Sequence, residues 1–525
     1  MLPVVSILWL AATGGTDSLP HLLTVVFPRA AGRTLELLLL TGLFAAVWGI
    51  STAWLTTACD FPFRRLLTAA LVLPLAIPGY LAAYAFGEFL DYTGPVQTAI
   101  RTLFGYQSVR DYWFPNIRSM GGAVLVLSSV LYPYLFLSCR AMFLMQGRSA
   151  ADVARTLGAS PWRVFLKVQL PMARPAIAVG LSLVMMESLN DIGTVEYLGV
   201  NTLTFAIYDN WLNRGSLGGA AQLAVILLLA AAALIAIERR ARKRQRFASG
   251  KTTSVVHDAV RLKLKGWRGA AAAVMCFIPV ALGFLIPVLV LGGYAVKRLD
   301  HLADAKLMRA IWTSMTVSGL TALFAVMLGF LLAYSARFAR SRLTGLSARV
   351  AALGYGVPGT VLALGVLLPF AAFDNVLDSR MRELFGVSTG LLLSGTGFAI
   401  VYALTARFLT MAEGTIDSGF QKLSPHLDMA ARTLGRSRLQ ALVSVLLPNL
   451  RPALMTAALL VFIETLKELS ATILLRPFNF NTLATLVYED ASRSRVEDAS
   501  IAALIIILAG LIPALLVSRS LDRSR

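Results

Sequence analysis

The sequence predicts an all-α polytopic membrane protein. Of its 525 residues, 57% are hydrophobic and only 14% are charged, whereas a soluble domain carries about a quarter charged residues. A membrane helix needs roughly 20 apolar residues to cross about 30 Å of hydrocarbon, and apolar runs of that length recur along the whole chain. We therefore expect about 12 transmembrane helices joined by modest loops.

Eleven apolar runs are candidates for these helices. They lie at 35–58, 66–89, 120–144, 174–198, 217–237, 269–296, 312–336, 347–372, 387–410, 452–475 and 499–518. A twelfth candidate, Leu2–Thr13, is too short to span alone. A signal peptide is the alternative, but this segment lacks a positively charged start. We expect a truncated first span.

The basic residues are unevenly shared between alternate loops. The segments 14–33, 90–119 and 200–216 contain six Lys or Arg, whereas 59–66, 145–174 and 238–268 contain eighteen. The positive-inside rule places the second set in the cytoplasm. The formal net charge of +20 therefore points to a lipid bilayer as the partner surface. Nucleic-acid binding is not expected, because no basic groove or reading module is recognisable.

An internal repeat divides the chain. Ala154–Gly158 recurs as Ala431–Gly435, both reading ARTLG, at an offset of 277. Pro78-Gly79 recurs as Pro358-Gly359 at an offset of 280. The sequence thus predicts a first half at 1–240, a basic cytoplasmic linker at 241–265 and a second half at 266–525.

Six spans per half would give two parallel six-helix repeats with a passage expected where the repeats meet. Proline and glycine together predict a kinked or broken helix at Pro78-Gly79 and at Pro358-Gly359. A packing kink without a role in transport is the alternative.

The repeated ARTLG segments lie in loops that the charge pattern places in the cytoplasm. Glycines at 158 and 435 allow the positive φ that a sharp turn between two short helices requires. Pro171 and Pro448 follow each glycine by thirteen residues, just before the next span. With no nucleophile, base or metal cluster in it, the motif predicts a docking element; an interfacial loop without a partner is the alternative.

These two segments resemble the EAA loop of ABC importer permeases, whose pattern is Glu-Ala-Ala, three residues, Gly, nine residues, Ile, one residue, Leu-Pro. The copies lie at 150–171 and 427–448, with Asp152 and Met429 in place of the leading Glu and Val in place of Ile. The resemblance implies a type I-like ABC importer fold and a coupling helix in each loop. The residues it assigns to coupling are Asp152, Ala154, Arg155, Gly158, Pro171, Asp428, Ala431, Arg432, Gly435 and Pro448.

The resemblance extends to the fused permeases of ferric iron importers. Its most specific piece is Lys467–Thr472 followed by Arg476–Phe480. It implies a permease in the bacterial cytoplasmic (inner) membrane that moves ferric iron from periplasm to cytoplasm, with two ABC ATPase subunits and a periplasmic solute-binding protein as partners. Thiamine, phosphonate or a polyamine is the alternative cargo, and an ion-coupled secondary transporter is the alternative class.

The chain itself is not expected to be an enzyme. Gly250-Lys251-Thr252 ends like a phosphate loop, but Gln245 stands where the first glycine belongs. The four histidines are scattered, and the three cysteines fit no zinc or disulfide pattern. We therefore assign no metal site and no bound cofactor, and the resemblance places ATP and Mg²⁺ on the partner ATPases.

Four carboxylates fall inside predicted spans. Glu187 matches Glu464 and Asp191 matches Glu468 at the 277 offset. An i, i+4 spacing predicts that both members of each pair lie on one helical face. Ionisable groups within a span usually face a bundle interior or an aqueous cavity, so the four are candidates for a substrate pathway for a hard cation. A structural role, capping helix ends or pairing with nearby basic residues, is the alternative.

Overall fold

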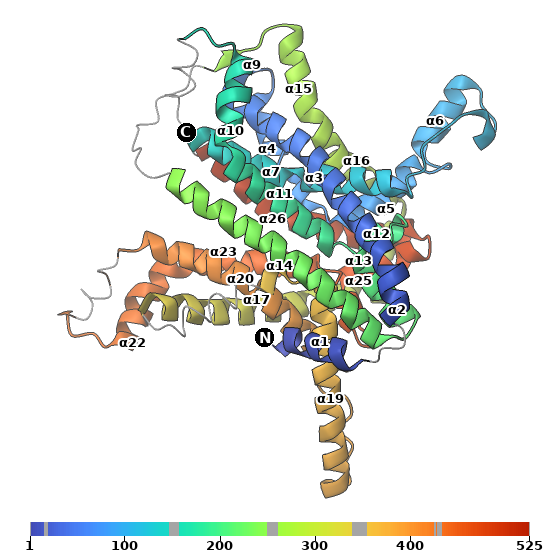
Figure 1. Cartoon of the computed structure of the whole chain (residues 1–525), viewed down its shortest axis with the longest axis vertical. Helices are drawn as coiled ribbons and strands as arrows, with labels where there is room; N and C mark the ends of the chain where they lie inside the picture. The colour runs from blue at the N-terminus through green and yellow to red at the C-terminus, as the bar shows by residue number, and fades with distance from the viewer. Residues whose placement is uncertain are drawn as a thin grey trace. The chain divides into compact units, whose positions relative to one another are not determined.

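The computed structural model describes residues 2–14, 19–145, 157–248, 261–338, 354–424, 427 and 433–523. These residues are predominantly helical (Figure 1). They form two compact units: unit 1 comprises Met1–Gly14 and Ala303–Leu486, and unit 2 comprises Gly15–Leu302 and Val487–Arg525. Each unit combines segments from both halves of the sequence, so the compact units and the sequence repeats divide the chain differently.

Unit 2 contains most of the first repeat. Its helices up to the first loop are α2 (Leu19–His21), η1 (Leu22–Val26), α3 (Phe27–Ala58), α4 (Arg64–Ala70), η2 (Leu73–Ala76), α5 (Gly79–Leu90), α6 (Pro95–Phe104), η3 (Val109–Asp111) and α7 (Met120–Met145). Those after the loop are α9 (Pro161–Val164), η4 (Phe165–Gln169), α10 (Leu170–Met172), α11 (Arg174–Asn190), α12 (Gly193–Tyr197), α13 (Leu203–Tyr208), η5 (Asp209–Asn213) and α14 (Leu217–Ala248). It also includes α15 (Trp267–Val280), η6 (Ala281–Leu285), α16 (Ile286–Lys297) and α26 (Val496–Arg523).

Unit 1 contains most of the second repeat. Its helices are α1 (Leu2–Thr13), α17 (Ala305–Phe338), η8 (Gly354–Gly356), α19 (Gly359–Phe385), α20 (Phe398–Lys422), α22 (Arg438–Ala441), η9 (Leu442–Leu446), α23 (Leu447–Leu466) and α24 (Thr472–Leu475). Two elements lie across the unit boundaries, η7 (Leu299–Ala303) and α25 (Leu483–Ser492). The strands are two residues each: β1 (Cys59–Asp60) pairs in parallel with β2 (Leu262–Lys263).

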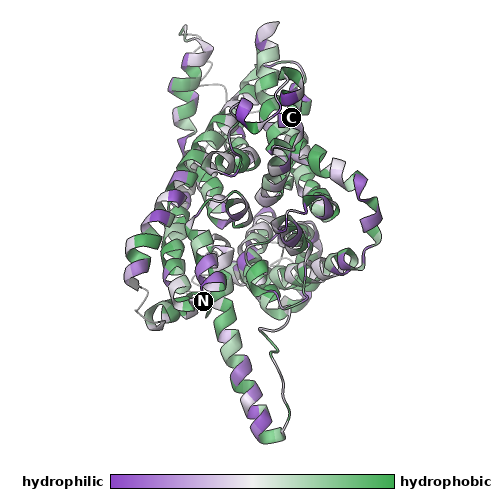
Figure 2. Ribbon diagram, turned by 90° about the vertical axis from the view of Figure 1, so that its right-hand side faces the viewer, coloured by the Kyte–Doolittle hydropathy of each residue, from purple (hydrophilic) through white to green (hydrophobic). Residues whose placement is uncertain are grey.

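The helices have the length and composition of membrane spans. Within the described residues, eight helices are long and apolar enough to cross a membrane, or up to ten if each of two bent helix pairs counts as one span. Hydrophobic residues, drawn in green, recur along the helices (Figure 2). In α3, for example, Leu37 and Ala45 are buried while Leu39 is 55% exposed, as expected for a helix with one face in lipid.

Two sequence predictions differ from the structure. The run 387–410 is not one span, because α20 begins only at Phe398 and its later turns carry charged residues such as Glu413 and Asp417. Helix α14 continues through Ala248, so the predicted linker at 241–265 begins as helix.

The helix breaks at the Pro-Gly pairs are confirmed. Pro78 directly precedes α5 and Pro358 directly precedes α19, each in extended backbone. A short 3-10 turn comes before each proline, η2 in one repeat and η8 in the other. The helix axes on the two sides of Pro78 differ by 99°, so the chain turns sharply here and is not gently kinked.

Several other prolines are accommodated inside helices by a wider turn. A proline has no N–H, and its ring collides with the carbonyl four residues earlier. Four prolines each follow a π-helical turn, with one residue between the turn and the proline. The N–H of that intervening residue donates to the carbonyl five residues earlier. The pairs are η1 with Pro28, η4 with Pro171, η6 with Pro287 and η9 with Pro448. The π turn moves the obstructing carbonyl aside and lets the helix continue.

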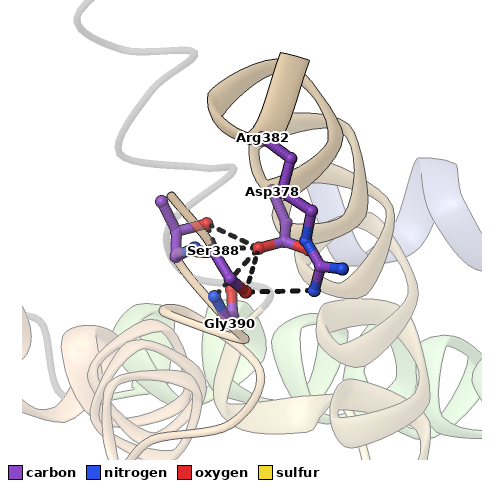
Figure 3. Close-up of polar contacts among 5 residues, drawn as sticks. Asp378, Arg382, Ser388 and Gly390 are labelled. Carbon is purple, nitrogen blue, oxygen red and sulfur yellow. Dashed lines mark hydrogen bonds and ion pairs between the residues drawn. The ribbon is translucent and has the colours of Figure 1, made fainter. Parts of the chain in front are cut away.

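The end of α19 is tied to the chain beyond it (Figure 3). The carboxylate of Asp378 accepts from the Ser388 hydroxyl at 2.8 Å and from the Gly390 N–H at 3.1 Å, and pairs with the Arg382 guanidinium at 2.8 Å. One turn earlier, buried Asp374 accepts from the backbone and hydroxyl of Ser394 at 2.7 Å. These bonds satisfy backbone groups that the loop itself leaves unpaired.

Two glycines allow close helix contacts at equivalent positions of the repeats. A Cβ on Gly49 in α3 would lie 2.6 Å from the Leu135 Cβ in α7. A Cβ on Gly329 in α17 would lie 2.9 Å from the Glu413 backbone nitrogen in α20. Small residues at such positions let helix backbones approach closely in membranes.

Gly49→Ala is therefore expected to destabilise the protein by about 1–3 kcal/mol, because the added methyl group overpacks the α3–α7 contact. Gly32→Ala on the same helix is the matched control, because its Cβ would meet nothing within 4 Å. That change should leave stability equal or higher, since alanine is the better helix former. Thermal unfolding of the detergent-purified variants measures both, and an equal midpoint for the two would contradict the close contact.

Candidate functional site

The two predicted coupling loops are only partly within the described residues. Asp152, Ala154, Arg155, Asp428, Ala431 and Arg432 lie outside them. Gly158, Pro171, Gly435 and Pro448 lie within them. The described part of each loop is thus its glycine turn and the helix that leads from that turn to the next span.

Both glycines adopt the predicted turn conformation. Gly158 has φ +81° and Gly435 has φ +82°, the left-handed region that favours glycine. A Cβ on either residue would meet nothing within 4 Å. The backbone conformation, not crowding, therefore requires glycine here.

The helix after each glycine starts with the same serine cap. The Ser160 hydroxyl accepts from the Arg163 N–H at 3.4 Å, and the Ser437 hydroxyl accepts from the Gln440 N–H at 3.3 Å. In the second copy the Gln440 side chain also accepts from the Ser437 N–H at 3.0 Å, which completes a capping box. These serines were not predicted from the sequence, although a serine three residues before a glutamine is a readable signal.

Exposed apolar side chains occupy equivalent positions in the two loops. Leu157 is 82% exposed and Leu434 is 83% exposed, each directly before the turn glycine. At the second residue of the helix that follows, Trp162 and Leu439 are 60% and 70% exposed. We call these four residues the apolar knobs. The prediction of a docking element named the glycines but missed these side chains.

The two copies differ after the loop. In the first, the helix axis turns by 69° between Pro161–Met172 and Arg174–Asn190, whereas in the second Leu439–Leu466 is one continuous span. The Trp54 indole of α3 donates to the Gln169 side chain at 2.9 Å beside the bend. Pro175 and Pro452 are equivalent, so proline alone does not explain the difference.

The intramembrane carboxylate pairs lie at helix ends. Asp191 is the C-cap of α11, and its N–H still donates to the Glu187 carbonyl at 3.1 Å. Helix α23 ends at Leu466, and the Glu468 N–H beyond it donates to the Thr465 carbonyl at 3.1 Å. The helical i, i+4 spacing therefore holds at the backbone for Glu187 and Asp191 but not for Glu464 and Glu468. The chain leaves the helix because these side chains cap the next, short helix.

In unit 2, Asp191 caps α12. Its carboxylate accepts from the Thr194 backbone N–H at 2.7 Å and from the Thr194 hydroxyl at 2.8 Å. The same carboxylate lies against the broken span, because a Cβ on Gly79 would collide with an Asp191 oxygen. Glycine at the start of α5 thus leaves the space that the carboxylate occupies. The negative charge there lies near the N-termini of α5 and α12, which stabilise it.

In unit 1, Glu468 occupies the equivalent position between the end of one helix and the start of the next, which we call the joint of each repeat. It accepts from the Ala471 N–H at 2.8 Å and from the Thr472 N–H at 3.1 Å at the start of α24. It also forms a buried ion pair with Arg407 of α20 at 2.8 Å, with side-chain exposures of 4% and 8%. A Cβ on Gly359 would lie 2.8 Å from the Arg407 guanidinium.

The arginine marks a difference between the repeats. At the 280 offset, the counterpart of Arg407 is Leu127, whose side chain lies near Gly79 in unit 2. Hence the unit 1 joint carries a paired charge, whereas the unit 2 joint has a carboxylate beside a leucine. An arginine within an apolar stretch is itself a sequence signal for a buried partner, but the sequence analysis did not identify Arg407.

The remaining two carboxylates lie within the helices. Glu464 forms an ion pair with Lys467 at 2.8 Å, both side chains being mostly buried at 25% and 20% exposure. Glu187 lies in α11 and is partly buried. Glu187 and Asp191 belong to unit 2, and Glu464 and Glu468 belong to unit 1.

No group of three or more His, Cys, Asp or Glu residues placed to hold a metal occurs in the part of the chain that the structure describes. Cys59, Cys139 and Cys276 are buried and are not joined in disulfides.

A duplicated bundle of apolar helices, with a helix that starts directly after a Pro at each equivalent Pro-Gly pair and an equivalent glycine turn in each half, is the architecture of a multi-pass membrane permease. Residues 39–247 and 325–525 each match the family of binding-protein-dependent transport system inner membrane components. The chain belongs to this family, with two copies of its domain fused, and is the permease component of an ABC importer.

Relatives with known roles match different lengths of the chain. It is 26% identical over 502 residues to the Fe(3+)-transport system permease protein FbpB 2 of Haemophilus influenzae, covering 93% of this chain and 90% of the relative. It is 31% identical over 204 residues to the molybdenum transport system permease protein ModB of Escherichia coli, covering 38% of this chain and 86% of the relative. A solved bacterial ABC transporter for alginate aligns with a TM-score of 0.39 and 18% identity, over 49% of this chain and 96% of the other.

We expect Glu468→Gln to destabilise the protein by about 3–5 kcal/mol, because it leaves the buried Arg407 guanidinium without its counter-charge. Adding Arg407→Leu, the residue of the first repeat, should recover much of that loss. Thermal unfolding of the single and double variants measures the recovery. A double variant less stable than Glu468→Gln alone would show that Arg407 is held by other interactions.

Proposed function

We propose that this permease imports ferric iron from the periplasm to the cytoplasm across a bacterial inner membrane. The observation that carries the proposal is the similarity to the Haemophilus influenzae Fe(3+)-transport permease, which extends over 93% of the chain and includes both fused halves. The molybdenum permease, in contrast, matches only 38% of the chain. Thiamine, phosphonate and polyamine remain the alternative cargoes.

The acidic residues within the spans support a cation as cargo. An oxyanion such as molybdate or sulfate would be repelled by a carboxylate that lines the passage, for which Glu187 is the candidate, whereas Glu464 is neutralised by Lys467. A hard cation such as ferric iron prefers oxygen ligands. Because Asp191 and Glu468 are engaged as caps and Glu464 is paired with Lys467, we infer that these three carboxylates have structural roles and that Glu187 is the better candidate for contact with cargo.

The energy would come from partner subunits. We propose that two ABC ATPases, which would bind ATP and Mg²⁺, dock on the loops at 150–171 and 427–448, and that a periplasmic binding protein delivers the cargo. The apolar knobs support this, because exposed Leu157 and Leu434 stand at turns of equivalent geometry. Exposed apolar residues of this kind mark protein interaction sites. This chain would contribute no catalytic group and no bound cofactor.

The experiment that tests the cargo is transport by the permease reconstituted in liposomes with its ATPase and binding protein. We expect ATP-dependent accumulation of radioactive iron supplied as ferric ion, and none of molybdate or sulfate. Accumulation of an oxyanion without iron would contradict the proposed cargo while leaving the importer architecture in place.

Replacing both knob leucines, Leu157→Glu with Leu434→Glu, is expected to abolish copurification of the ATPase, since the change puts charge at the centre of two apolar contacts. Leu103→Glu is the matched control: Leu103 in α6 is 80% exposed, but the charge pattern places it on the opposite membrane face. Loss of the ATPase in the control alone, or in neither variant, would contradict the docking surface.

A further inference from the structure

Equivalent tyrosines of the two repeats meet in unit 2. Tyr208 in α13 and Tyr488 in α25 are counterparts at the 280 offset, within the matching segments Asn201-Thr202-Leu203 and Asn481-Thr482-Leu483. Their phenol oxygens lie 3.3 Å apart. Equivalent atoms of a duplicated chain can approach each other this closely only where the two copies meet, which is where the sequence predicts the passage.

The helices that carry these tyrosines are held by equivalent bonds. The Leu203 N–H at the start of α13 donates to the Thr34 hydroxyl at 2.8 Å. The Leu483 N–H at the start of α25 donates to the Ser314 hydroxyl at 2.7 Å. All four residues are buried. The tyrosines therefore project from positions fixed in the same way in each repeat.

A carboxylate binds one tyrosine of the pair. Both oxygens of Glu196, in α12, lie 2.6 Å from the Tyr488 hydroxyl. The counterpart of Glu196 is Ile473 at the 277 offset and Arg476 at the 280 offset, so the second repeat has no carboxylate at the equivalent position. Nearby, the buried Tyr84 ring packs edge-on against Tyr197, the residue after Glu196, with 4.7 Å between ring centroids, and the Tyr84 hydroxyl has no hydrogen-bond partner among the described residues.

Glu196 has no cationic partner in the described part of the chain. Its hydrogen bonds come from Tyr488. By contrast, Glu468 pairs with Arg407 and Glu464 pairs with Lys467. A half-buried carboxylate without a counter-charge in an apolar protein is costly. A cation bound beside Glu196 would lower the free-energy cost of burying its carboxylate.

We propose that Glu196, Tyr208 and Tyr488 form a transient binding site for the ferric ion as it crosses the membrane. The site rests on the proposed cargo and names the residues that would hold it. Carboxylate and phenolate oxygens are hard ligands that suit a hard trivalent ion. On binding, each phenol releases its proton to water and its oxygen bonds to iron, with no change in oxidation state. Release reverses the step.

Charge balance explains why the site suits this ion. One carboxylate and two phenolates carry three negative charges, which a trivalent cation neutralises completely, so the occupied site places no net charge in the low-dielectric interior. An oxyanion would be repelled by Glu196. Three protein ligands leave further coordination positions to water, and this incomplete cage allows the ion to leave, as a passage requires.

The first experiment is a titration of the purified full-length permease with ferric nitrilotriacetate. We expect a visible phenolate-to-iron charge-transfer band that weakens in Tyr208→Phe and in Tyr488→Phe and disappears in the double variant. Glu196→Gln should weaken binding about tenfold or more. Tyr294→Phe is the matched control, because its hydroxyl donates to another carboxylate, that of Glu88, at 3.0 Å. Absence of the band in the wild type, or its persistence in the double variant, would overturn the site.

The second experiment separates this site from the cargo itself. In the reconstituted importer, Glu196→Gln and the double phenylalanine variant should lose most iron uptake while they still bind the ATPase, and Tyr294→Phe should retain uptake. Iron uptake at the wild-type rate in the site variants would overturn the site and leave the proposed function standing. No iron uptake by the wild type would instead contradict the proposed cargo, and the titration alone would then decide whether the site binds ferric ion.

Discussion

A membrane protein must satisfy every backbone N–H and C=O from within itself, because hydrocarbon offers no hydrogen bonds. This chain nevertheless interrupts its helices at Pro78-Gly79, at Pro358-Gly359, and after α11 and α23. The interruptions persist because a carboxylate lies at each joint: Asp191 in one repeat and Glu468 in the other receive N–H groups that start the next helix. Glycine beside each joint leaves the room that the side chains need. The starts of the short helices α12 and α24 depend on this arrangement.

The same joints show what duplication has preserved. Features of the backbone recur at equivalent positions. They are the glycine turns at 158 and 435, the π turns before Pro171 and Pro448, and the bond from the first N–H of α13 or α25 to a hydroxyl of α3 or α17. Side chains at the same joints have changed more freely. Geometry has therefore been kept where it decides the path of the chain, and chemistry has diverged around it.

Much of this architecture could be predicted from the sequence, because its causes are local. Long apolar runs predict spans, proline followed by glycine predicts a break, and a repeated ARTLG predicts a repeated turn. The carboxylates were found but their setting was not, since helical periodicity assumes that the helix continues past Asp191 and Glu468. Arg407, Glu196 and the tyrosine pair were missed for a different reason. Their roles depend on contacts between segments far apart in the sequence, such as Tyr488 with Glu196, and no local pattern encodes those.

The difference between Leu127 and Arg407 at equivalent positions has a consequence for how such a chain can evolve. Two identical subunits would present the same charge at both joints, and any gain at one would be imposed on the other. Fusion into a single polypeptide removes that constraint, so one joint can hold a neutralised pair while its twin keeps an acid beside a leucine. A homodimer cannot reach this electrical asymmetry, and each half of the fused protein is free to specialise.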